Sequence, residues 1–330
     1  MEPTLAVTLG DPCGIGPEVL LKSLSGPGAS RLVVIGDLAV VTATARRHRL
    51  RVPRWSVLDQ PEALRRLSAS TGRGRRLIFV DLPSSTRFLP GHSRVASGAA
   101  ALAYLDCAIA LWRAGRLHGL VTGPVTKWAM QRRAPAFIGQ TEYLADAMKV
   151  RRVVMMFMSA RLNVALLTRH IPLRQVGAKV SGPLLEDSVR LVDHLFRRRL
   201  GRRRPRLALC GLNPHAGERG LCGTEEQRLL APVRRLRRSG ISIDGPLAAD
   251  GLFPAAGRYD AVICWYHDQG LIPFKLLARD IGCQLSVGLP IVRTSPDHGS
   301  ALDIAGRGVA DPGSMRYALR LAASLMHHEK

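Results

Sequence analysis

The sequence predicts an α/β fold with mixed, largely parallel sheets, and three observations point to it. Short apolar runs rich in β-branched residues alternate along the chain with stretches of helical periodicity, a pattern typical of parallel sheets with right-handed crossovers. The 330 residues are 46% hydrophobic, which is enough for one large or two moderate domains. The runs 153–158 and 162–168 follow each other closely, so we expect an antiparallel hairpin that makes the sheet mixed.

The apolar runs and periodic stretches give a first assignment of the elements. Strands are expected over 4–10, 31–37, 76–82, 119–125, 153–158, 162–168, 206–212 and 259–266. Helices are expected after Pro17 and over 97–114, 140–148, 181–198, 224–239 and 312–327. The last helix is expected to return to the first half. This gives a discontinuous first domain, 1–130 plus 290–330, and a second domain, 131–289, that carries most of the metal and substrate ligands.

The chain is strongly basic, with a formal net charge of +23 at pH 7. Most of the excess is arginine, in clusters at 46–54, 65–76, 196–206 and 233–240. These clusters lie at expected helix ends or links and contain no interleaved aromatic residues for base stacking. We therefore expect a basic solvent-exposed surface and no specific nucleic-acid partner.

Composition also indicates the compartment. No run approaches the length of a membrane span, and the N-terminus leads straight into a Gly-Asp-Pro turn and lacks a basic leader. The six cysteines form no C-x-x-C pair. We expect a cytoplasmic protein with reduced thiols and no membrane partner.

Two loops that follow expected strands contain candidate ligand-binding residues. "GDPCGIGPE" follows the first strand, and its glycines, including Gly14, precede a helix N-terminus that either receives an anion or cofactor or is a plain turn. It lacks the spacing of a G-x-G-x-x-G loop. Lys127 begins a helix after the 119–125 run, either as an acid/base or anion ligand or as an exposed lysine.

Three histidines follow three later strands: His170, His215 and His267. The carboxyl ends of parallel strands converge, so these side chains are expected to approach one another. Three imidazoles with an open fourth position describe a catalytic site for zinc or a neighbouring divalent metal. Asp268 is either a fourth ligand or a group that orients His267.

The segment 288–308 is dense in polar side chains between apolar runs. It contains Arg293, Ser295, Asp297, His298 and Asp303. We interpret it as a binding surface, with a long polar crossover loop as the alternative.

Seven motifs occur in order along nearly the whole chain. They are "GDPCGIGPE", "VTGPVTK", "RHIPL", "LNPHAGERG", "GPLAADGLF", "YHDQGLIPFK" and "GLPIVRTSPDHGSALDIAGRG". With them the chain resembles the 4-hydroxythreonine-4-phosphate dehydrogenase family of vitamin B6 biosynthesis.

The resemblance implies two α/β domains with a cleft between them, as in isocitrate and isopropylmalate dehydrogenases. It implies one divalent metal (zinc, magnesium, manganese or cobalt) held by the residues matching His170, His215 and His267, in a site at a homodimer interface. It also implies oxidation of a small phosphorylated substrate by NAD or NADP, followed by loss of CO2.

The resemblance also assigns residues to the substrate and the cofactor. Lys275 and Arg293 are expected to hold the anionic substrate. Gln140 stands beside Thr141 where the family has histidine, and Gln284 replaces an asparagine. Nicotinamide-cofactor contacts are expected from Gly14, Ser295, Asp297, His298 and Asp303, and the acid/base group is either Lys127 or Asp268.

Other functions stay open at this point. The two glutamines leave a phosphorylated four-carbon sugar acid as the runner-up substrate. An aromatic cis-dihydrodiol carboxylate is a weaker alternative, because "GLPIVRTS" keeps its arginine. A metal-dependent hydrolase would use the same histidines but would leave 288–308 unexplained.

Overall fold

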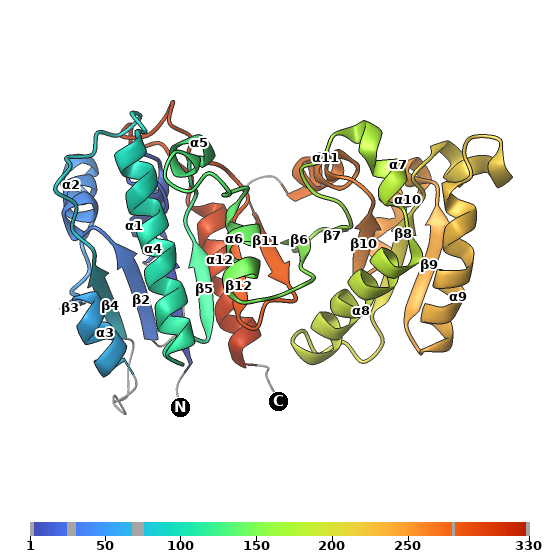
Figure 1. The fold of residues 1–330 in the computed structure, drawn as a ribbon, viewed down its shortest axis with the longest axis horizontal. Helices are drawn as coiled ribbons and strands as arrows, with labels where there is room; N and C mark the ends of the chain where they lie inside the picture. The colour runs from blue at the N-terminus through green and yellow to red at the C-terminus, as the bar shows by residue number, and fades with distance from the viewer. Residues whose placement is uncertain (1–2, 25–30, 68–75, 279–280, 328–330) are drawn as a thin grey trace. The chain divides into compact units, whose positions relative to one another are not determined.

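The protein, described here by a computed structural model over residues 3–24, 31–67, 76–278 and 281–327, divides into two compact units. Among the described residues, unit 1 comprises those within 3–150 and 289–327, and unit 2 comprises those within 151–288. Figure 1 shows the elements of both units.

Unit 1 is built on parallel strands. They are β1 (Thr4–Thr8), β2 (Arg31–Gly36), β3 (Ser56–Leu58), β4 (Arg76–Asp81), β5 (Gly119–Thr122) and β12 (Val292–Pro296). Their order is β3-β4-β2-β1-β5-β12, and each neighbouring pair is parallel. The carboxyl ends of these strands therefore lie along one edge, where the loops that follow them gather.

Helices cover this sheet and begin where the sequence offers caps. They are α1 (Gly16–Ser23), α2 (Leu38–His48), α3 (Gln60–Arg66), α4 (Val95–Arg113), α5 (Lys127–Gln131), α6 (Gln140–Ala147) and α12 (Gly313–His327). Asp37 caps α2, since its carboxylate accepts the backbone N–H groups of Ala39 and Val40. Helix α12 packs on β12 and β5, which confirms that the last helix returns to the first half.

Helix α4 corrects one expectation about membrane spans. It is the one helix among the described residues that is long and apolar enough to cross a membrane by length and composition, and 50% of that window is buried. Its buried positions, among them Tyr104, Leu105 and Leu111, fit its packing against β1 and β2. The apolar content of α4 is therefore accounted for by the core of unit 1.

Unit 2 has a mixed sheet. Its strands are β6 (Val154–Ser159), β7 (Asn163–Leu166), β8 (Arg206–Cys210), β9 (Ser242–Leu247), β10 (Ala261–Cys264) and β11 (Gly282–Val287), in the order β11-β6-β7-β10-β8-β9. Strand β6 pairs antiparallel with both β7 and β11, and the other pairs are parallel. The predicted hairpin is thus confirmed.

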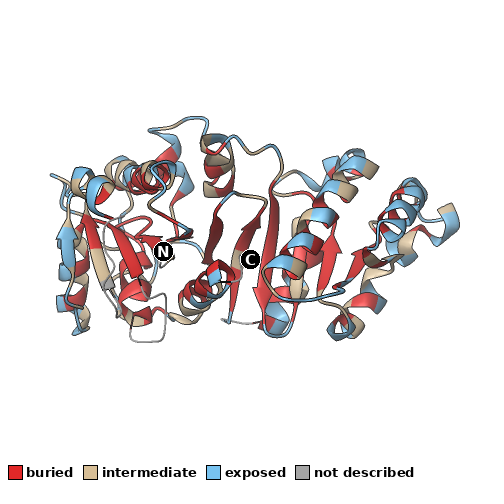
Figure 2. Ribbon diagram, turned by 90° about the horizontal axis from the view of Figure 1, so that it is seen from below, coloured by how far each residue is buried: buried red, intermediate tan, exposed pale blue. Residues whose placement is uncertain are grey.

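The helices of unit 2 flank this sheet. They are α7 (Val176–Lys179), α8 (Gly182–Arg198), α9 (Leu230–Arg238), α10 (Ala249–Leu252) and α11 (His267–Ala278), with short 3-10 segments η1 (Leu173–Gln175), η2 (Pro214–Gly220), η3 (Glu225–Leu229) and η4 (Phe253–Arg258). Strand and helix side chains such as Phe157, Val262 and Phe274 form a buried core. Figure 2 shows most strands as buried and the outer helix faces as exposed.

Several elements differ from the sequence expectation. Strands β3, β9, β11 and β12 and helices α2, α3 and α11 were not anticipated. Strand β12 lies inside the segment 288–308, which was interpreted as a binding surface with a polar crossover loop as the alternative, and its polar residues Arg293, Thr294 and Ser295 are buried. Part of the arginine cluster 65–76 falls outside the described residues.

The boundary between the units also differs from the predicted one. Residues 131–150, placed by the sequence in the second domain, belong to unit 1. The reason is a small apolar cluster in which Phe137 packs with Ala101, Leu105 and Met130, which ties this stretch to α4 and α5.

The contact between α4 and α5 yields a stability prediction. A Cβ at Gly98 would lie 2.2 Å from the carbonyl carbon of Ala129, so Gly98→Ala forces the helices apart. We expect the free energy of unfolding in urea to fall by about 2 kcal/mol, although helix propensity alone would raise it. Gly251→Ala is the matched control, since nothing lies within 4 Å of its added Cβ. Equal stability of both variants and the wild type would contradict the proposed clash.

Candidate functional site

Three loops meet at the carboxyl ends of β1, β5 and β12 in unit 1. Gly10 has a φ of +76°, and a Cβ on it would lie 2.2 Å from the carbonyl oxygen of Pro124. A Cβ on Gly14 would lie 2.9 Å from Ser300, whose carbonyl accepts the Ile15 N–H at 3.0 Å. The motifs "GDPCGIGPE", "VTGPVTK" and "SPDHGS" therefore form one surface, as the sheet topology predicted.

Asp11 organises the first of these loops, and the sequence analysis did not select it. Its side chain is fully buried. Oδ1 accepts the Cys13 N–H at 2.9 Å, and Oδ2 accepts the Ser93 hydroxyl at 2.6 Å. Burial, together with the Asp11 charge, raises the pKa of the Cys13 thiol, so this thiol stays protonated at neutral pH and is no nucleophile.

Arg293 is the central cation of unit 1. Its side chain is 2% exposed, and its guanidinium donates to the hydroxyls of Thr122 at 2.5 Å and Thr141 at 3.2 Å. It also donates to Gln140 Oε1 at 3.4 Å, while Gln140 Nε2 donates to the Gly123 carbonyl at 2.9 Å. Gln140, Thr141 and Arg293 thus come together as predicted. Thr122 was missed, although a polar residue at the end of an apolar strand is a usable signal.

Apart from Gly14, which lies in the loop between β1 and α1, the predicted cofactor residues lie at the end of β12 and beyond it. Ser295 is buried in the strand. The Asp297 N–H donates to Ser314 Oγ at 2.9 Å, and that hydroxyl donates back to Asp297 Oδ1 at 3.0 Å, which fixes the segment to the start of α12. His298 is half-buried and Asp303 is exposed.

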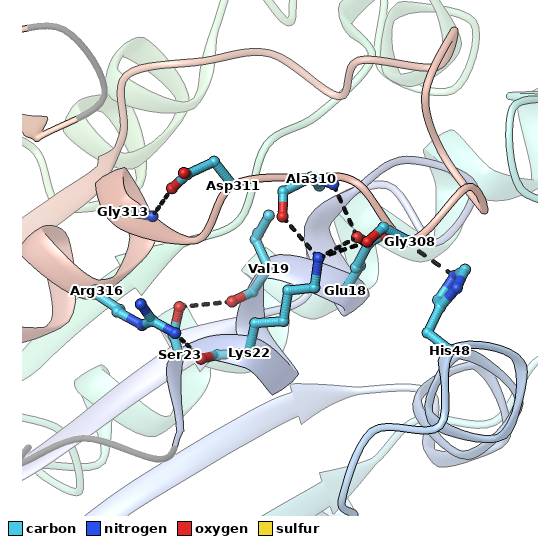
Figure 3. A network of polar contacts seen from close by, with 10 residues as sticks. All are labelled: Glu18, Val19, Lys22, Ser23, His48, Gly308, Ala310, Asp311, Gly313 and Arg316. Carbon is cyan, nitrogen blue, oxygen red and sulfur yellow. Dashed lines mark hydrogen bonds and ion pairs between the residues drawn. The ribbon is translucent and has the colours of Figure 1, made fainter.

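A polar network then holds the following segment against α1 (Figure 3). Lys22 Nζ donates to the carbonyls of Gly308 at 2.8 Å and Ala310 at 2.9 Å, and to Glu18 Oε1 at 2.8 Å. The Ala310 N–H donates to the same carboxylate oxygen at 2.9 Å. Glu18 is 2% exposed and its other oxygen lies 3.8 Å from His48 Nε2. This network fixes the glycine-rich segment that follows Asp303.

In unit 2, two of the three predicted histidines are neighbours. His170 follows β7 and His267 begins α11 directly after β10. Their ring centroids are 5.7 Å apart. Asp268 Oδ1 lies 2.7 Å from His267 Nδ1, which is hydrogen-bonding distance. The roles predicted for Asp268, as a fourth ligand, an orienting group or an acid/base, stay predictions.

His215 lies in an unusual stretch after β8. Six successive residues, 215 to 220, have positive φ, and only Gly217 and Gly220 among them are glycines. Glu226 supports the stretch, because its buried carboxylate accepts the N–H groups of Leu212 and Asn213 at 2.8 Å each. A Cβ on Gly217 would lie 2.7 Å from Glu226 Oε2, so the support requires glycine there.

The donor chemistry of these histidines fits a divalent metal, but one chain does not complete the set. Within the described residues, no group of three or more His, Cys, Asp or Glu side chains is gathered as a metal site. His170 and His267 form a pair, and His215 does not join it. The site formed by all three histidines therefore stays a prediction, of which the described residues of one chain show the His170–His267 pair.

Two buried side chains connect the strand ends that carry His215 and His267. Gln269 Nε2 donates to the Gly211 carbonyl at 2.8 Å, and its Oε1 accepts the Trp265 N–H at 2.8 Å. Trp265 Nε1 donates to the Cys210 carbonyl at 3.0 Å. These bonds fix the end of β10 against the end of β8, and neither residue was identified from the sequence.

The remaining candidates are more exposed. Lys127 begins α5 in unit 1 and is exposed, and Lys275 is exposed on α11 in unit 2. Gln284 is half-buried on β11. Each lies at or near an element that also carries another candidate residue.

A family model and curated relatives match nearly the whole chain. The model described as "Pyridoxal phosphate biosynthetic protein PdxA" matches residues 29–322. A 4-hydroxythreonine-4-phosphate dehydrogenase from Desulforapulum autotrophicum is 38% identical, covering 98% of this chain and 95% of the relative. One from Methylorubrum populi is 44% identical, covering 97% and 94%.

Solved structures agree with these relatives. A 4-hydroxythreonine-4-phosphate dehydrogenase from Klebsiella pneumoniae has a TM-score of 0.84 and 34% identity, covering 99% of this chain and 98% of that one. A terephthalate 1,2-cis-dihydrodiol dehydrogenase from Burkholderia xenovorans has a TM-score of 0.67 and 29% identity, covering 98% of each chain. On the extent of these matches, the chain belongs to the PdxA family and is an oxidoreductase.

Proposed function

We propose that this chain is a 4-hydroxythreonine-4-phosphate dehydrogenase. It oxidises the C3 hydroxyl of 4-phosphohydroxy-L-threonine with NAD or NADP and a divalent metal, and the product loses CO2 to give 3-amino-2-oxopropyl phosphate for pyridoxal phosphate synthesis. The observation that carries this proposal is the buried Arg293 guanidinium beside Thr122, Gln140 and Thr141, in a chain similar end to end to relatives of that name.

Arg293 supplies a fixed positive charge for the anionic substrate. Because strand β12 and three side-chain acceptors hold its guanidinium, little conformational entropy is lost when an anion binds. From the family resemblance, Lys275 on α11 and Gln284 on β11 are also proposed to bind the substrate, Lys275 as a cation and Gln284 through its amide. The two-ended anion, with phosphate and carboxylate, suits a site with more than one cation.

The His267–Asp268 pair supports the acid/base and metal assignments. In the tautomer in which His267 Nδ1–H donates a hydrogen bond to the Asp268 carboxylate, the Nε2 lone pair is left to bind a cation. When bound, the divalent metal supplies Lewis acidity and the nicotinamide accepts the hydride. Asp268 or Lys127 moves the hydroxyl proton, and both are exposed enough to exchange it with solvent.

A homodimer accounts for the histidines that one chain leaves apart. Helix α11, which begins at His267, exposes large apolar side chains: Ile272 is 60% and Leu276 73% exposed. Leu221, close to His215 in sequence, is 87% exposed. Apolar side chains beside polar ligands are typical of a subunit interface. The metal site is therefore proposed to be completed where two copies meet, in a cytoplasmic enzyme.

The runner-up substrate, a phosphorylated four-carbon sugar acid, keeps one specific observation in its favour. Gln140 contacts Arg293 where the family has a histidine, and an amide cannot become cationic or act as a general acid. Substrate choice therefore depends on how Gln140 positions Arg293.

The proposed reaction is tested by reduction of NAD and NADP with 4-phosphohydroxy-L-threonine, followed by absorbance of the reduced nicotinamide. We expect turnover that a chelator abolishes and that added divalent metal restores, because the hydroxyl needs the metal for oxidation. His215→Ala should abolish turnover with the fold retained, as judged by circular dichroism. Wild-type turnover in His215→Ala with the metal lost would refute the three-histidine site.

The proposed dimer is tested by Leu276→Asp. A charge at this exposed apolar position should convert the dimer to monomer in analytical ultracentrifugation and reduce turnover at least about tenfold, because an unpaired charge at an interface is costly. Leu230→Asp is the matched control, since Leu230 is 45% exposed on α9. A Leu276→Asp protein that stays dimeric and fully active would place the interface elsewhere.

The role of Gln140 is tested by two substitutions and two substrates. Gln140→Leu removes both amide hydrogen bonds and should lower kcat/KM for 4-phosphohydroxy-L-threonine about tenfold. Gln140→His should retain most of it, since a neutral imidazole both accepts from Arg293 and donates to Gly123. If the wild type prefers a phosphorylated tetronic acid and Gln140→His reverses that preference, the runner-up replaces the B6 intermediate.

A further inference from the structure

Unit 1 contains a cavity of about 370 Å³ that none of the residues assigned above lines. It opens between α2 and the segment 84–90, at the carboxyl ends of β2 and β4. Its lining comprises Pro12, Asp37, Ala39, Val40, Ala43, Thr44, Arg47, Ser84, Ser85, Thr86, Arg87, Phe88, Leu89 and Pro90. In an open α/β sheet this is the edge where ligands bind.

Hydrogen bonds fix the base of this cavity. Asp37 Oδ1 accepts from the first turn of α2, and its Oδ2 accepts the Ser84 N–H at 3.1 Å. Asp81 Oδ1 accepts the Leu38 N–H at 2.9 Å. The two walls are therefore joined through buried or half-buried carboxylates, and the cavity is preformed.

The lining combines three kinds of chemistry. Val40, Phe88 and Leu89 are apolar, and serine and threonine residues contribute hydroxyls. Arg47 and Arg87 are exposed, and within the described ranges neither guanidinium has a hydrogen-bond or ion-pair partner. An apolar surface with hydroxyls and two available guanidinium groups suits a base, a ribose and phosphate groups, respectively.

The cavity borders the segment predicted to contact the cofactor. A Cβ on Gly306 would lie 2.7 Å from Pro90 and 3.8 Å from Arg47 Nη1. The Gly91 N–H donates to the Cys13 carbonyl at 2.8 Å, and a Cβ on Gly91 would lie 3.1 Å from the Leu302 carbonyl oxygen. One wall therefore adjoins both the "GDPCGIGPE" loop and the segment around Asp303.

The network in Figure 3 fixes the backbone that follows the segment around Asp303. Lys22 and Glu18 hold the backbone of Gly308 and Ala310, and a Cβ on Gly308 would lie 2.8 Å from His48 Nδ1. His48 directly follows Arg47 on α2. The position of Arg47 relative to the segment is thus set by the fold.

We propose that this cavity binds the adenosine-phosphate half of the nicotinamide cofactor, with Arg47 and Arg87 holding its phosphate groups. This inference rests on the proposed dehydrogenase function. The substrate is assigned to Arg293 at β5 and β12, and β1 lies between these strands and the β2–β4 end. The base packs on Val40 and Phe88, and the ribose hydroxyls face Thr44 and the 84–86 hydroxyls.

The test measures binding of ADP-ribose, the cofactor without its nicotinamide, by calorimetry on the full-length protein. Arg47→Ala and Arg87→Ala should each weaken binding about tenfold, because each removes a charge-assisted hydrogen bond. Arg46→Ala is the matched control: Arg46 is the neighbour of Arg47 on α2, is exposed, and does not line the cavity. Its dissociation constant should equal that of the wild type.

A second variant blocks the space itself. Ala43 is an exposed lining residue, so Ala43→Trp fills the cavity without disturbing the core and should abolish ADP-ribose binding. In the turnover assay, the arginine variants should raise KM for the dinucleotide and leave KM for the phosphorylated substrate unchanged.

The outcomes separate this inference from the proposed function. Wild-type ADP-ribose affinity in Ala43→Trp and in the Arg47→Ala/Arg87→Ala double variant would overturn it, as would no binding by the wild type. Arginine-dependent ADP-ribose binding without turnover of 4-phosphohydroxy-L-threonine would sustain the cofactor site and refute the proposed substrate.

Discussion

The close approach of two backbones at the ends of β1 and β5 is the constraint on which unit 1 depends. A Cβ on Gly10 would lie 2.2 Å from the Pro124 carbonyl oxygen, and one on Gly123 2.4 Å from the Leu9 carbonyl oxygen. Any side chain at either position would separate the two strand ends. The Asp11 N–H bond to Pro124, and with it the loop that leads into α1, exists only because both positions are glycine.

The close packing of these strands also determines where the Arg293 guanidinium lies. Strand β12 pairs with β5 in a register that places Arg293 opposite Leu120. The guanidinium therefore reaches Thr122 and the first two residues of α6, Gln140 and Thr141. Burying a cation is costly unless its N–H groups find acceptors. Thr122, Thr141 and Gln140 provide them, and these three acceptors are neutral. These hydrogen bonds hold the guanidinium in one position within the buried strand.

The sequence predicted the regular part of this fold well and the functional part unevenly. The short apolar runs located β1, β2, β4, β5, β6, β7, β8 and β10, because most residues of these strands are apolar. It missed β12, since a buried Arg-Thr-Ser stretch looks like a loop when its partners lie far away in sequence. It missed α11 because Gly270 and Pro273 argue against a helix there, and the packing of Leu271 and Phe274 in the unit 2 core overrides that preference.

The three histidines show most clearly which features of the site the local sequence pattern does not predict. Strand order β7-β10-β8 places the ends carrying His170, His267 and His215 next to one another, which is what the sequence reasoning assumed. The direction in which each histidine side chain points, however, depends on the backbone conformation after its strand. His267 enters a helix, whereas His170 and His215 adopt positive φ values of 45° and 52°, a conformation that no sequence pattern here announced.

Positive φ at a side chain other than glycine costs about 1 kcal/mol or more, and it persists only where surrounding bonds impose it. For His215 those bonds come from buried Glu226, which accepts the N–H groups of Leu212 and Asn213 just before it. A plain connecting loop would relax such strain, because neither His170 nor His215 is buried. Strain at two exposed histidines fits the proposal that they are metal ligands, because a preformed ligand position is one reason for a fold to hold a costly backbone conformation.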